Sequence, residues 1–341
     1  MKAAVATLRG TVLLVLLLSA GCAGQQSALE PRGPEAAQLA QLFWVFTATC
    51  GAIWIMVIIG LGVAISHRSR NGDRLGHGPL ALDQNRDRKT AFIVGALVTA
   101  TTAILIALTI LSYFATRTLA ASGDKLNIEV TAHQWWWEVT YSDKEPSRVF
   151  QTANEIHVPV GRPVKFTLKA ADVIHSFWIP NLGGKQDLIP GQVNTIAFTP
   201  DHAGTYRGQC AEFCGLQHAH MALYVIVQNE REFESWREAQ VRPAPSLSMP
   251  GPITGQQVFF NRGCALCHTI RGTSAGGRLG PDLIHVATRK TIAAGTLPTT
   301  PHGLSAWLAD PQGVKPGNKM PDISLQTAEL TALESYLGSL Q

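Results

Sequence analysis

Two long apolar runs constrain the fold of this chain more than any other feature of its sequence. The stretches 42–65 and 91–115 contain no charged residue, and each is long enough to cross a bilayer as an α-helix. A buried hairpin in a water-soluble protein is the alternative, but so much uncharged sequence argues against it. We therefore predict a transmembrane helical hairpin over residues 40–116.

The segment between the two runs sets the orientation of this hairpin. Residues 67–90 carry six Arg or Lys residues against three Asp, and such a basic excess in a short loop places the loop in the cytoplasm. Both ends of the hairpin must then face outside. The basic excess is local, because the formal net charge of the whole chain is only +4, which gives no case for a nucleic-acid partner.

The N-terminus independently indicates export. Lys2 and Arg9 precede an apolar run over residues 12–18, and Ser-Ala-Gly-Cys22 follows, which is typical of a secretory signal over residues 1–22. Acylation of Cys22, as in a lipoprotein, and ordinary cleavage nearby are the two interpretations. Of the six cysteines, one is Cys22, Cys50 lies in the first apolar run, and the other four form two pairs with ligand or attachment spacing. None is left for a disulfide framework.

A metal-binding pattern occupies residues 210–221, which read CAEFCGLQHAHM. The pattern offers the thiols of Cys210 and Cys214, the imidazole of His218 and the thioether of Met221. Soft sulfur ligands combined with imidazole favour copper, or zinc when the set is closed and rich in thiolates. Two thiolates four residues apart can bridge two copper ions. Another imidazole must come from elsewhere, and His175 is the natural candidate; a zinc site or a disulfide is the competing interpretation.

This pattern and the segment His175-Ser-Phe-Trp resemble the binuclear copper (CuA) site of cytochrome c oxidase subunit II. The resemblance implies six copper ligands: the side chains of His175, Cys210, Cys214, His218 and Met221, and the backbone carbonyl of Glu212. It also implies that the Glu212 side chain binds a magnesium ion shared with oxidase subunit I.

The run His133-Gln-Trp-Trp-Trp-Glu138 resembles the aromatic segment of the same family. The resemblance makes Trp135 the residue through which electrons arrive from cytochrome c. Three adjacent Trp side chains would alternate between the faces of a strand, so one or two of them are expected to belong to the core.

The residues around the copper pattern have strand character over 124–232. The segment 164–169 alternates apolar and polar residues, as a half-buried strand does. Further strands are predicted at 193–198, 206–209 and 221–227, with Gly and Pro turns between them. Short strands with regular turns favour an all-β sandwich. The resemblance implies a cupredoxin-like barrel, in which the ligand loop joins the last two strands.

The C-terminal part contains an attachment motif for c-type haem. A Pro-rich segment, 241–252, is predicted to be an extended, semi-rigid spacer. It is followed by Cys264-Ala-Leu-Cys267-His268, in which the two thiols add to the haem vinyl groups and His268 binds the iron. Met320 is expected as the sixth iron ligand. A redox-active dithiol or a zinc site is the alternative.

Two further segments resemble small cytochromes c. In Gly280-Pro-Asp-Leu283 the Pro281 carbonyl would hold the ring of the axial His, and residues 325–337 would form the C-terminal helix, with Ser324 as N-cap and Gly338 as stop signal. We therefore expect a small all-α class I cytochrome c domain over 253–341.

The whole chain thus resembles subunit II of a caa-type oxidase, a multidomain membrane protein with a helical hairpin, a copper barrel and a fused cytochrome c. The resemblance implies that electrons pass from an external donor to haem c, then to CuA, then to subunit I, where oxygen becomes water and protons are translocated. Subunits I and III are the implied partners. The implied donor is a soluble or membrane-bound cytochrome c or a bc complex. The implied location is the bacterial inner (plasma) membrane, with both cofactor domains on its periplasmic face.

Three alternatives stay open on the sequence: the electron-input subunit of a CuA-containing nitric oxide reductase, a stand-alone membrane-tethered electron carrier, and a copper storage or delivery protein. One departure from the family pattern is visible. Many members carry a Glu near the start of the second span that helps supply protons, whereas residues 85–90 here read NRDRKT. We therefore assign no proton-input residue.

Overall fold

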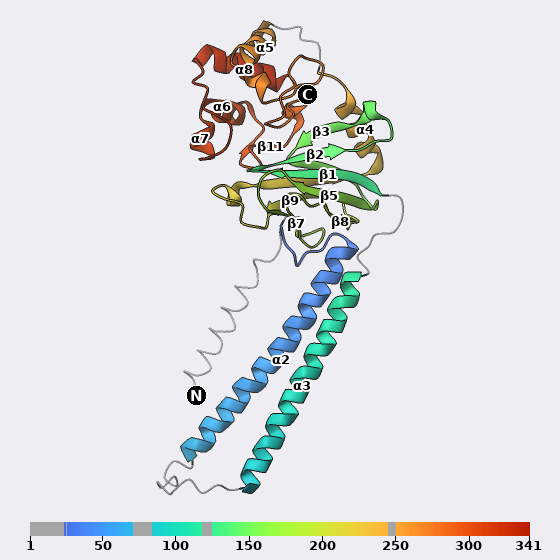
Figure 1. Ribbon diagram of the computed structural model, residues 1–341, viewed down its shortest axis with the longest axis vertical. Helices are drawn as coiled ribbons and strands as arrows, with labels where there is room; N and C mark the ends of the chain where they lie inside the picture. Colours follow the sequence, from blue (N-terminus) through green and yellow to red (C-terminus); the bar gives the residue numbers. More distant parts are fainter. Residues whose placement is uncertain (1–23, 25, 71–83, 118–124, 245–249) are drawn as a thin grey trace, which may run out of the picture. The chain divides into compact units, whose positions relative to one another are not determined.

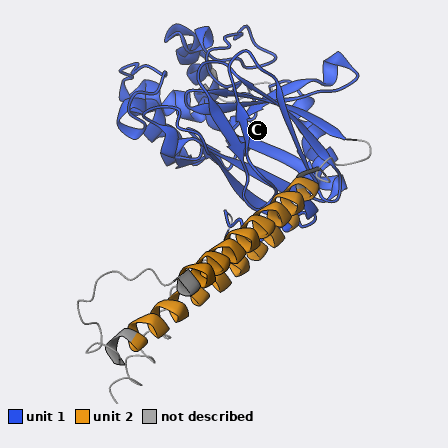
Figure 2. Cartoon of the chain, turned by 60° about the horizontal axis from the view of Figure 1, so that its bottom comes forward, with its two compact units in different colours: residues 1–37, 121–341 blue, residues 38–120 orange. Residues whose placement is uncertain are grey.

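The computed structural model describes residues 24, 26–70, 84–117, 125–244 and 250–341. The predicted signal, residues 1–22, lies outside the described residues. The chain divides into two compact units, one of residues 38–120 and the other of residues 1–37 and 121–341 (Figure 2). Each unit is described by itself.

Two long helices make up most of the unit of residues 38–120: α2, Pro34–Arg70, whose first turn belongs to the other unit, and α3, Gln84–Arg117 (Figure 1). Both contain a segment long and apolar enough to cross a membrane, Pro34–His67 and Asp87–Ala115. Their apolar side chains, such as Trp54 and Phe92, are exposed to the surroundings. Thr hydroxyls inside the helices bond to carbonyls one turn earlier, for example Thr49 to Val45 at 2.8 Å, so these polar groups are satisfied without water. The predicted hairpin is confirmed.

Ten short strands build the predicted copper domain, called the copper domain below, as two five-stranded sheets. The first sheet has the order β3-β2-β1-β5-β8, with the bounds β1 Leu126–His133, β2 Trp136–Tyr141, β3 Phe150–Ala153, β5 Val164–Ala170 and β8 Asn194–Phe198. The second sheet has the order β4-β10-β9-β6-β7, with the bounds β4 Glu155–Pro159, β6 His175–Trp178, β7 Gln186–Leu188, β9 Gly204–Cys210 and β10 Ala222–Gln228.

The core of this domain consists of residues that alternate along the strands. In β1 and β5 every second side chain is buried, because successive side chains of a strand point to opposite faces. Large buried residues fill the interior, among them Trp137, Phe166 and Phe177. The strands predicted at 164–169, 193–198, 206–209 and 221–227 correspond to β5, β8, β9 and β10, and the all-β fold class is confirmed. Two 3₁₀ turns, Pro146–Arg148 and His218–His220, lie between strands.

Helix α4, Glu230–Val241, follows β10 and packs on the barrel. Its N-cap is Asn229, whose side chain accepts from the amide of Glu232 at 2.9 Å. Phe233 is fully buried, and Trp236 stacks on the ring of His157 with centroids 4.0 Å apart.

The predicted cytochrome c domain, called the haem domain below, consists of four helices and short connecting elements. The helices are α5 Pro250–Asn261, α6 Pro301–Ala309, α7 Pro311–Val314 and α8 Thr327–Gly338. Two 3₁₀ turns, Cys264–Leu266 and Val286–Thr288, and a hairpin of β11 Thr291–Ile292 and β12 Leu297–Pro298 complete it. Helices α5 and α8 approach closely at Gly255, where a Cβ would lie 2.0 Å from the carbonyl oxygen of Ala332.

Three predictions about segment ends are wrong in detail. Helix α8 begins at Thr327 rather than at 325, and a capping box of Gln326 and Glu329 replaces Ser324 as the start signal. Gly338 is the last residue of α8 instead of following it. In the predicted spacer, residues 250–252 lie in α5, so the extended conformation does not hold there; residues 245–249 lie outside the described part of the chain.

Candidate copper and haem sites

The loop between β9 and β10 positions the predicted copper ligands. Cys210 is the last residue of β9, and its amide donates to the carbonyl of Met221 at 2.9 Å. This bond closes the loop, so that Met221 lies opposite Cys210. The neighbouring strand β6 begins with His175 and pairs with β9 through Phe177 and Cys210. The sheet register therefore brings together ligands that are 35 residues apart along the chain.

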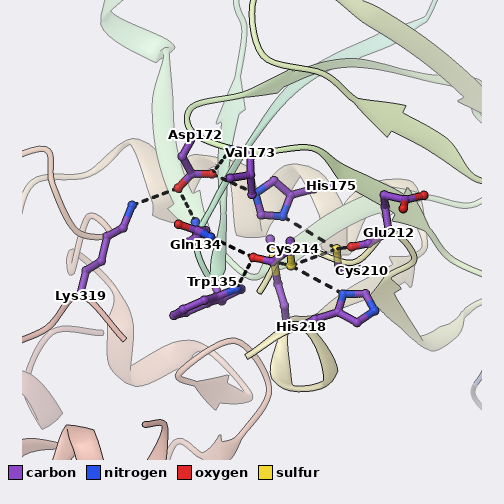
Figure 3. Close-up of polar contacts among 11 residues, drawn as sticks. Gln134, Trp135, Asp172, Val173, His175, Cys210, Glu212, Cys214, His218 and Lys319 are labelled. Carbon is purple, nitrogen blue, oxygen red and sulfur yellow. Dashed lines mark hydrogen bonds and ion pairs between the residues drawn. The ribbon is translucent and has the colours of Figure 1, made fainter. Parts of the chain in front are cut away.

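The two thiols form the centre of the site (Figure 3). The Sγ atoms of Cys210 and Cys214 are 3.8 Å apart. His175 approaches one side with its Nδ1 3.8 Å from the sulfur of Cys210. His218 approaches the other side with its Nδ1 3.6 Å from the sulfur of Cys214. Each sulfur thus has its own imidazole.

Met221 and the backbone of Glu212 complete the set of donors. The sulfur of Met221 is 3.9 Å from that of Cys214, and the carbonyl oxygen of Glu212 is 3.3 Å from that of Cys210. The structure therefore brings all six predicted donors together. The Glu212 carboxylate points away from the sulfur atoms (Figure 3). His220 is not in this set, because its Nδ1 pairs with Gln217 at 2.9 Å.

The chemistry of the donor set fits a copper pair. Both cysteines are unpaired, and their separation of 3.8 Å excludes a disulfide in this structure. A hydrogen bond from the Cys214 thiol lowers the pKa of Cys210, whose thiolate in turn raises the pKa of Cys214. Two thiolates this close repel each other unless a cation lies between them. Thiolate, thioether and imidazole donors together favour copper among the common metals.

Asp172 supports the site from behind His175. Its Oδ1 is 3.0 Å from Nε2 of His175, so Nε2 carries the proton. The unprotonated Nδ1 then faces the thiols with a lone pair that can bind a metal. Burial alone would raise the pKa of Asp172, but hydrogen bonds from His175 and from the amides of Gln134 and Val173 lower it to about 2. Burial likewise opposes the charge on His175, but Cys210 and Asp172 outweigh it and raise its pKa.

Trp135 contacts the ligand loop directly. Its indole Nε1 donates to the carbonyl of Cys214 at 2.9 Å, and the Gln134 side chain donates to the same oxygen at 2.9 Å. At Gly215, with φ +112°, a Cβ would lie 3.0 Å from the indole ring, so a side chain there would displace it. Residues 134–135 form the turn between β1 and β2, so the expectation of one continuous strand is wrong. Trp137 is fully buried in the core.

The cysteines of the haem motif lie on one tight turn. Cys264 begins the turn Cys264–Leu266, and the amide of His268 donates to the carbonyl of Cys264 at 3.0 Å. Cys264 and Cys267 are unpaired and half-buried. Thioether attachment needs two free thiols, so this turn fits a covalent haem.

The ring of His268 is held as an axial iron ligand requires. Its Nδ1 donates to the carbonyl of Pro281 at 2.8 Å, which leaves Nε2 as the free donor atom. At Gly280 a Cβ would lie 2.5 Å from this ring, so the close approach depends on glycine. Burial lowers the pKa of His268 and favours the neutral ring that binds a metal.

Met320 lies in a loop in which both its amide and its carbonyl form hydrogen bonds to side chains. Its amide donates to the side chain of Asn318 at 2.8 Å, and its carbonyl accepts from the side chain of Gln312 at 2.7 Å. The Met320 side chain packs against the core of the haem domain. Sequence reasoning did not single out Asp172, Gln134 or Asn318; Asp172 carried a weak signal, since it stands three residues before a predicted ligand.

Comparison with known proteins assigns the two domains that carry these sites to known families. Residues 144–229 match the family model of the cytochrome c oxidase subunit II periplasmic domain, and residues 253–341 match that of cytochrome c. A cytochrome c oxidase subunit 2 from Alkalihalophilus pseudofirmus is 32% identical over 352 residues, which cover 96% of this chain and 95% of the relative. The chain belongs to the cytochrome c oxidase subunit II family. Another member, from Bacillus sp. (strain PS3), is 34% identical over 70% of each chain.

A solved structure of the periplasmic domain of subunit II of cytochrome oxidase from Bradyrhizobium japonicum is 34% identical. It covers 35% of this chain and 95% of the solved chain, with a TM-score of 0.33. As a subunit II with a fused cytochrome c domain, this chain is part of a haem-copper oxidase, so subunit I is its implied partner. The two domains imply CuA and haem c as cofactors. The sequence interpretation of family and function is confirmed.

Proposed function

We propose that this subunit II holds its two cofactors through the residues identified from the sequence. The copper pair would be bound by His175, Cys210, Cys214, His218, Met221 and the carbonyl of Glu212. Haem c would be bound by Cys264, Cys267, His268 and Met320, with Pro281 orienting the imidazole. Each group supplies one-electron chemistry, in which an electron is taken up or released without a bond being broken.

The observation that carries this proposal is the contact between two unpaired, buried thiols, each beside its own imidazole Nδ1. These ligands are held by the sheet register and by hydrogen bonds to neighbouring residues. They therefore need little movement when the charge on the metal changes. Asp172 holds His175, and the closed loop holds Met221. The chain's own task is therefore to keep these donors fixed while electrons pass.

We further propose the direction of transfer. The haem domain receives an electron from an external cytochrome c or bc complex and delivers it to the copper domain, in which Trp135 contacts the ligand loop. The copper domain then passes it to subunit I. Fusion of the two domains gives the donor a high effective concentration. Subunit III and a magnesium ion at the Glu212 carboxylate are further parts of the proposal, supported by the family resemblance alone.

The location follows from the charge pattern. The basic segment 67–90 would stay in the cytoplasm and both cofactor domains would lie on the outer face of a bacterial inner membrane.

The test is gas uptake by the purified complex, with Cys214→Ser as the informative variant and Cys50→Ser as the matched control. Cys50 is exposed on α2 and makes no part of the site. The parent and the control should consume oxygen with an external one-electron donor. Cys214→Ser should still accept electrons on haem c, but the haem should stay reduced under oxygen. Turnover by Cys214→Ser at the parent rate, or uptake of nitric oxide in place of oxygen, would contradict the proposal.

A further inference from the structure

Two segments of the haem domain contact the copper ligand loop. The side chain of Gln217 donates to the carbonyl of Pro316 at 2.7 Å. The amide of Ala222, directly after Met221, donates to the carbonyl of Ala294 at 3.0 Å. A backbone hydrogen bond thus joins the haem domain to the residue next to an expected copper ligand.

A buried lysine lies at the centre of this contact. Lys315 belongs to the haem domain, follows α7 and is only 2% exposed. Its Nζ donates to the carbonyl of Trp135 at 2.8 Å, to that of His220 at 2.9 Å and to that of Ala293 at 3.1 Å. An ammonium has three protons to donate, and three carbonyls from three separate segments accept them.

The environment of Lys315 is unusual for a buried cation. No carboxylate among the described residues forms an ion pair with it, although buried charges are normally paired. Burial lowers the pKa of Lys315 to about 7, which reflects the cost of removing the ammonium from water. Two of its three acceptors, at Trp135 and His220, belong to the copper domain, so the hydrogen bonds that offset this cost run across the contact between the two domains.

Lys315 is also tied to the expected haem ligand. Its carbonyl accepts from the side chain of Asn318 at 2.8 Å, and the same Asn318 side chain accepts from the amide of Met320 at 2.8 Å. A chain of hydrogen bonds therefore runs from the carbonyl of Trp135 through Lys315 and Asn318 to Met320.

We propose that Lys315 is a positioning residue that fastens the haem domain to the copper ligand loop and fixes the path between Met320 and Trp135. This inference rests on the proposed direction of transfer from haem to copper. Lys319 forms a second link, 3.0 Å from Asp172, but its side chain is 62% exposed. An exposed pair contributes little, so of the two lysine side chains the buried Lys315 is the stronger link.

The experiment compares Lys315→Met with the matched control Lys290→Met in the full complex. Methionine keeps the length of the lysine chain and removes the ammonium. Lys290 is an exposed lysine of the same domain, whose backbone amide, not its side chain, donates to Glu155. Two quantities are measured: the rate of electron transfer from photoreduced haem c to copper, and amide hydrogen exchange of the segments 291–297 and 311–320.

Lys315→Met should slow the transfer by about tenfold or more, since without this link the two domains are in contact for a smaller share of the time and the effective concentration of the haem beside the copper falls. It should also speed exchange of both segments by about tenfold. Exchange in α8 and the absorption spectrum of haem c should stay unchanged, which separates undocking from unfolding. Lys290→Met should match the parent in every measurement.

Parent-like transfer and parent-like exchange in Lys315→Met would overturn the inference. Faster exchange in the variant, together with no haem-to-copper transfer in the parent, would leave the fastening intact and refute the proposed direction of transfer instead. If Lys315→Met fails to fold, Gln217→Leu removes the contact with Pro316 from the copper side. It should speed exchange of 311–320 by about threefold, and no change there would overturn the inference.

Discussion

Replacement of Asp172 by Asn should weaken the copper domain although the two side chains have almost the same shape. The carboxylate accepts four hydrogen bonds or ion-pair contacts: at Oδ2 from the amide of Gln134 at 2.7 Å and from Lys319 at 3.0 Å, and at Oδ1 from the amide of Val173 at 2.8 Å and from His175 at 3.0 Å. An amide has one oxygen only. In either orientation of the Asn side chain, its NH₂ group would face two donors.

The size of the effect follows from these contacts. A pKa of about 2 in place of the ordinary 3.8 corresponds to roughly 2 kcal/mol in favour of the ionised form, of which solvent screening leaves about 1 kcal/mol. A part-buried amide that loses its acceptor adds about 1–2 kcal/mol. We expect Asp172→Asn to lower the free energy of unfolding of the unit that contains residues 121–341 by about 2–3 kcal/mol.

The pH dependence of this difference is fixed in sign. Because folding lowers the pKa of Asp172, its contribution is complete above the unfolded-state pKa near 4 and is lost as the pH falls through about 2. The gap in stability between the parent and Asp172→Asn should therefore be constant at neutral pH and narrow below about pH 4.

Denaturant unfolding of the full chain in detergent, followed by Trp fluorescence, measures the difference. Asp201→Asn is the matched control, since the carboxylate of Asp201 forms an exposed pair with His202, and the stability of this variant should stay within about 0.5 kcal/mol of the parent. A value for Asp172→Asn within the same range, or a gap that widens in acid, would refute the reasoning.

Three further variants test other parts of the account. Trp135→Leu removes the indole on the ligand loop and should slow haem c oxidation by about tenfold without loss of copper; an unchanged rate in stopped-flow spectroscopy would count against it. Met320→Leu should lower the haem potential, because a Met/His pair raises it, and a redox titration with no shift would exclude Met320 as a ligand. Gly255→Ala, whose Cβ would meet the Ala332 carbonyl at 2.0 Å, should destabilise the haem domain by about 2 kcal/mol or more, whereas Gly276→Ala, with open space around it, should not; equal melting temperatures would contradict the packing of α5 on α8.

Local sequence patterns predicted much of this structure. The spacing of Cys210, Cys214, His218 and Met221 was enough to predict that their side chains lie close together, because all four lie on one short loop. Alternation located β5, whose burial follows the period of two, and Gly and Pro turns separated the segments that became β8, β9 and β10.

The parts that sequence missed depend on contacts between distant segments. Lys315 reads as an ordinary surface lysine, and only the tertiary fold shows that carbonyls 180 and 95 residues away surround its ammonium. Ser324 is a good N-cap by composition, but its amide bonds to Asp322 and the competing Gln326–Glu329 box begins α8 further on. The turn at Trp135 was hidden because a Trp run favours a strand locally, while hydrogen bonds to Cys214 hold it in a turn.

Metal analysis of the purified full chain tests the central claim most directly. The arrangement of two buried thiols with two imidazoles and a thioether predicts two copper ions and one haem iron per chain, with a spin resonance spectrum in which one unpaired electron is shared by both coppers. Zinc in the site, a single copper ion, or Cys210 and Cys214 joined as a disulfide would contradict the account.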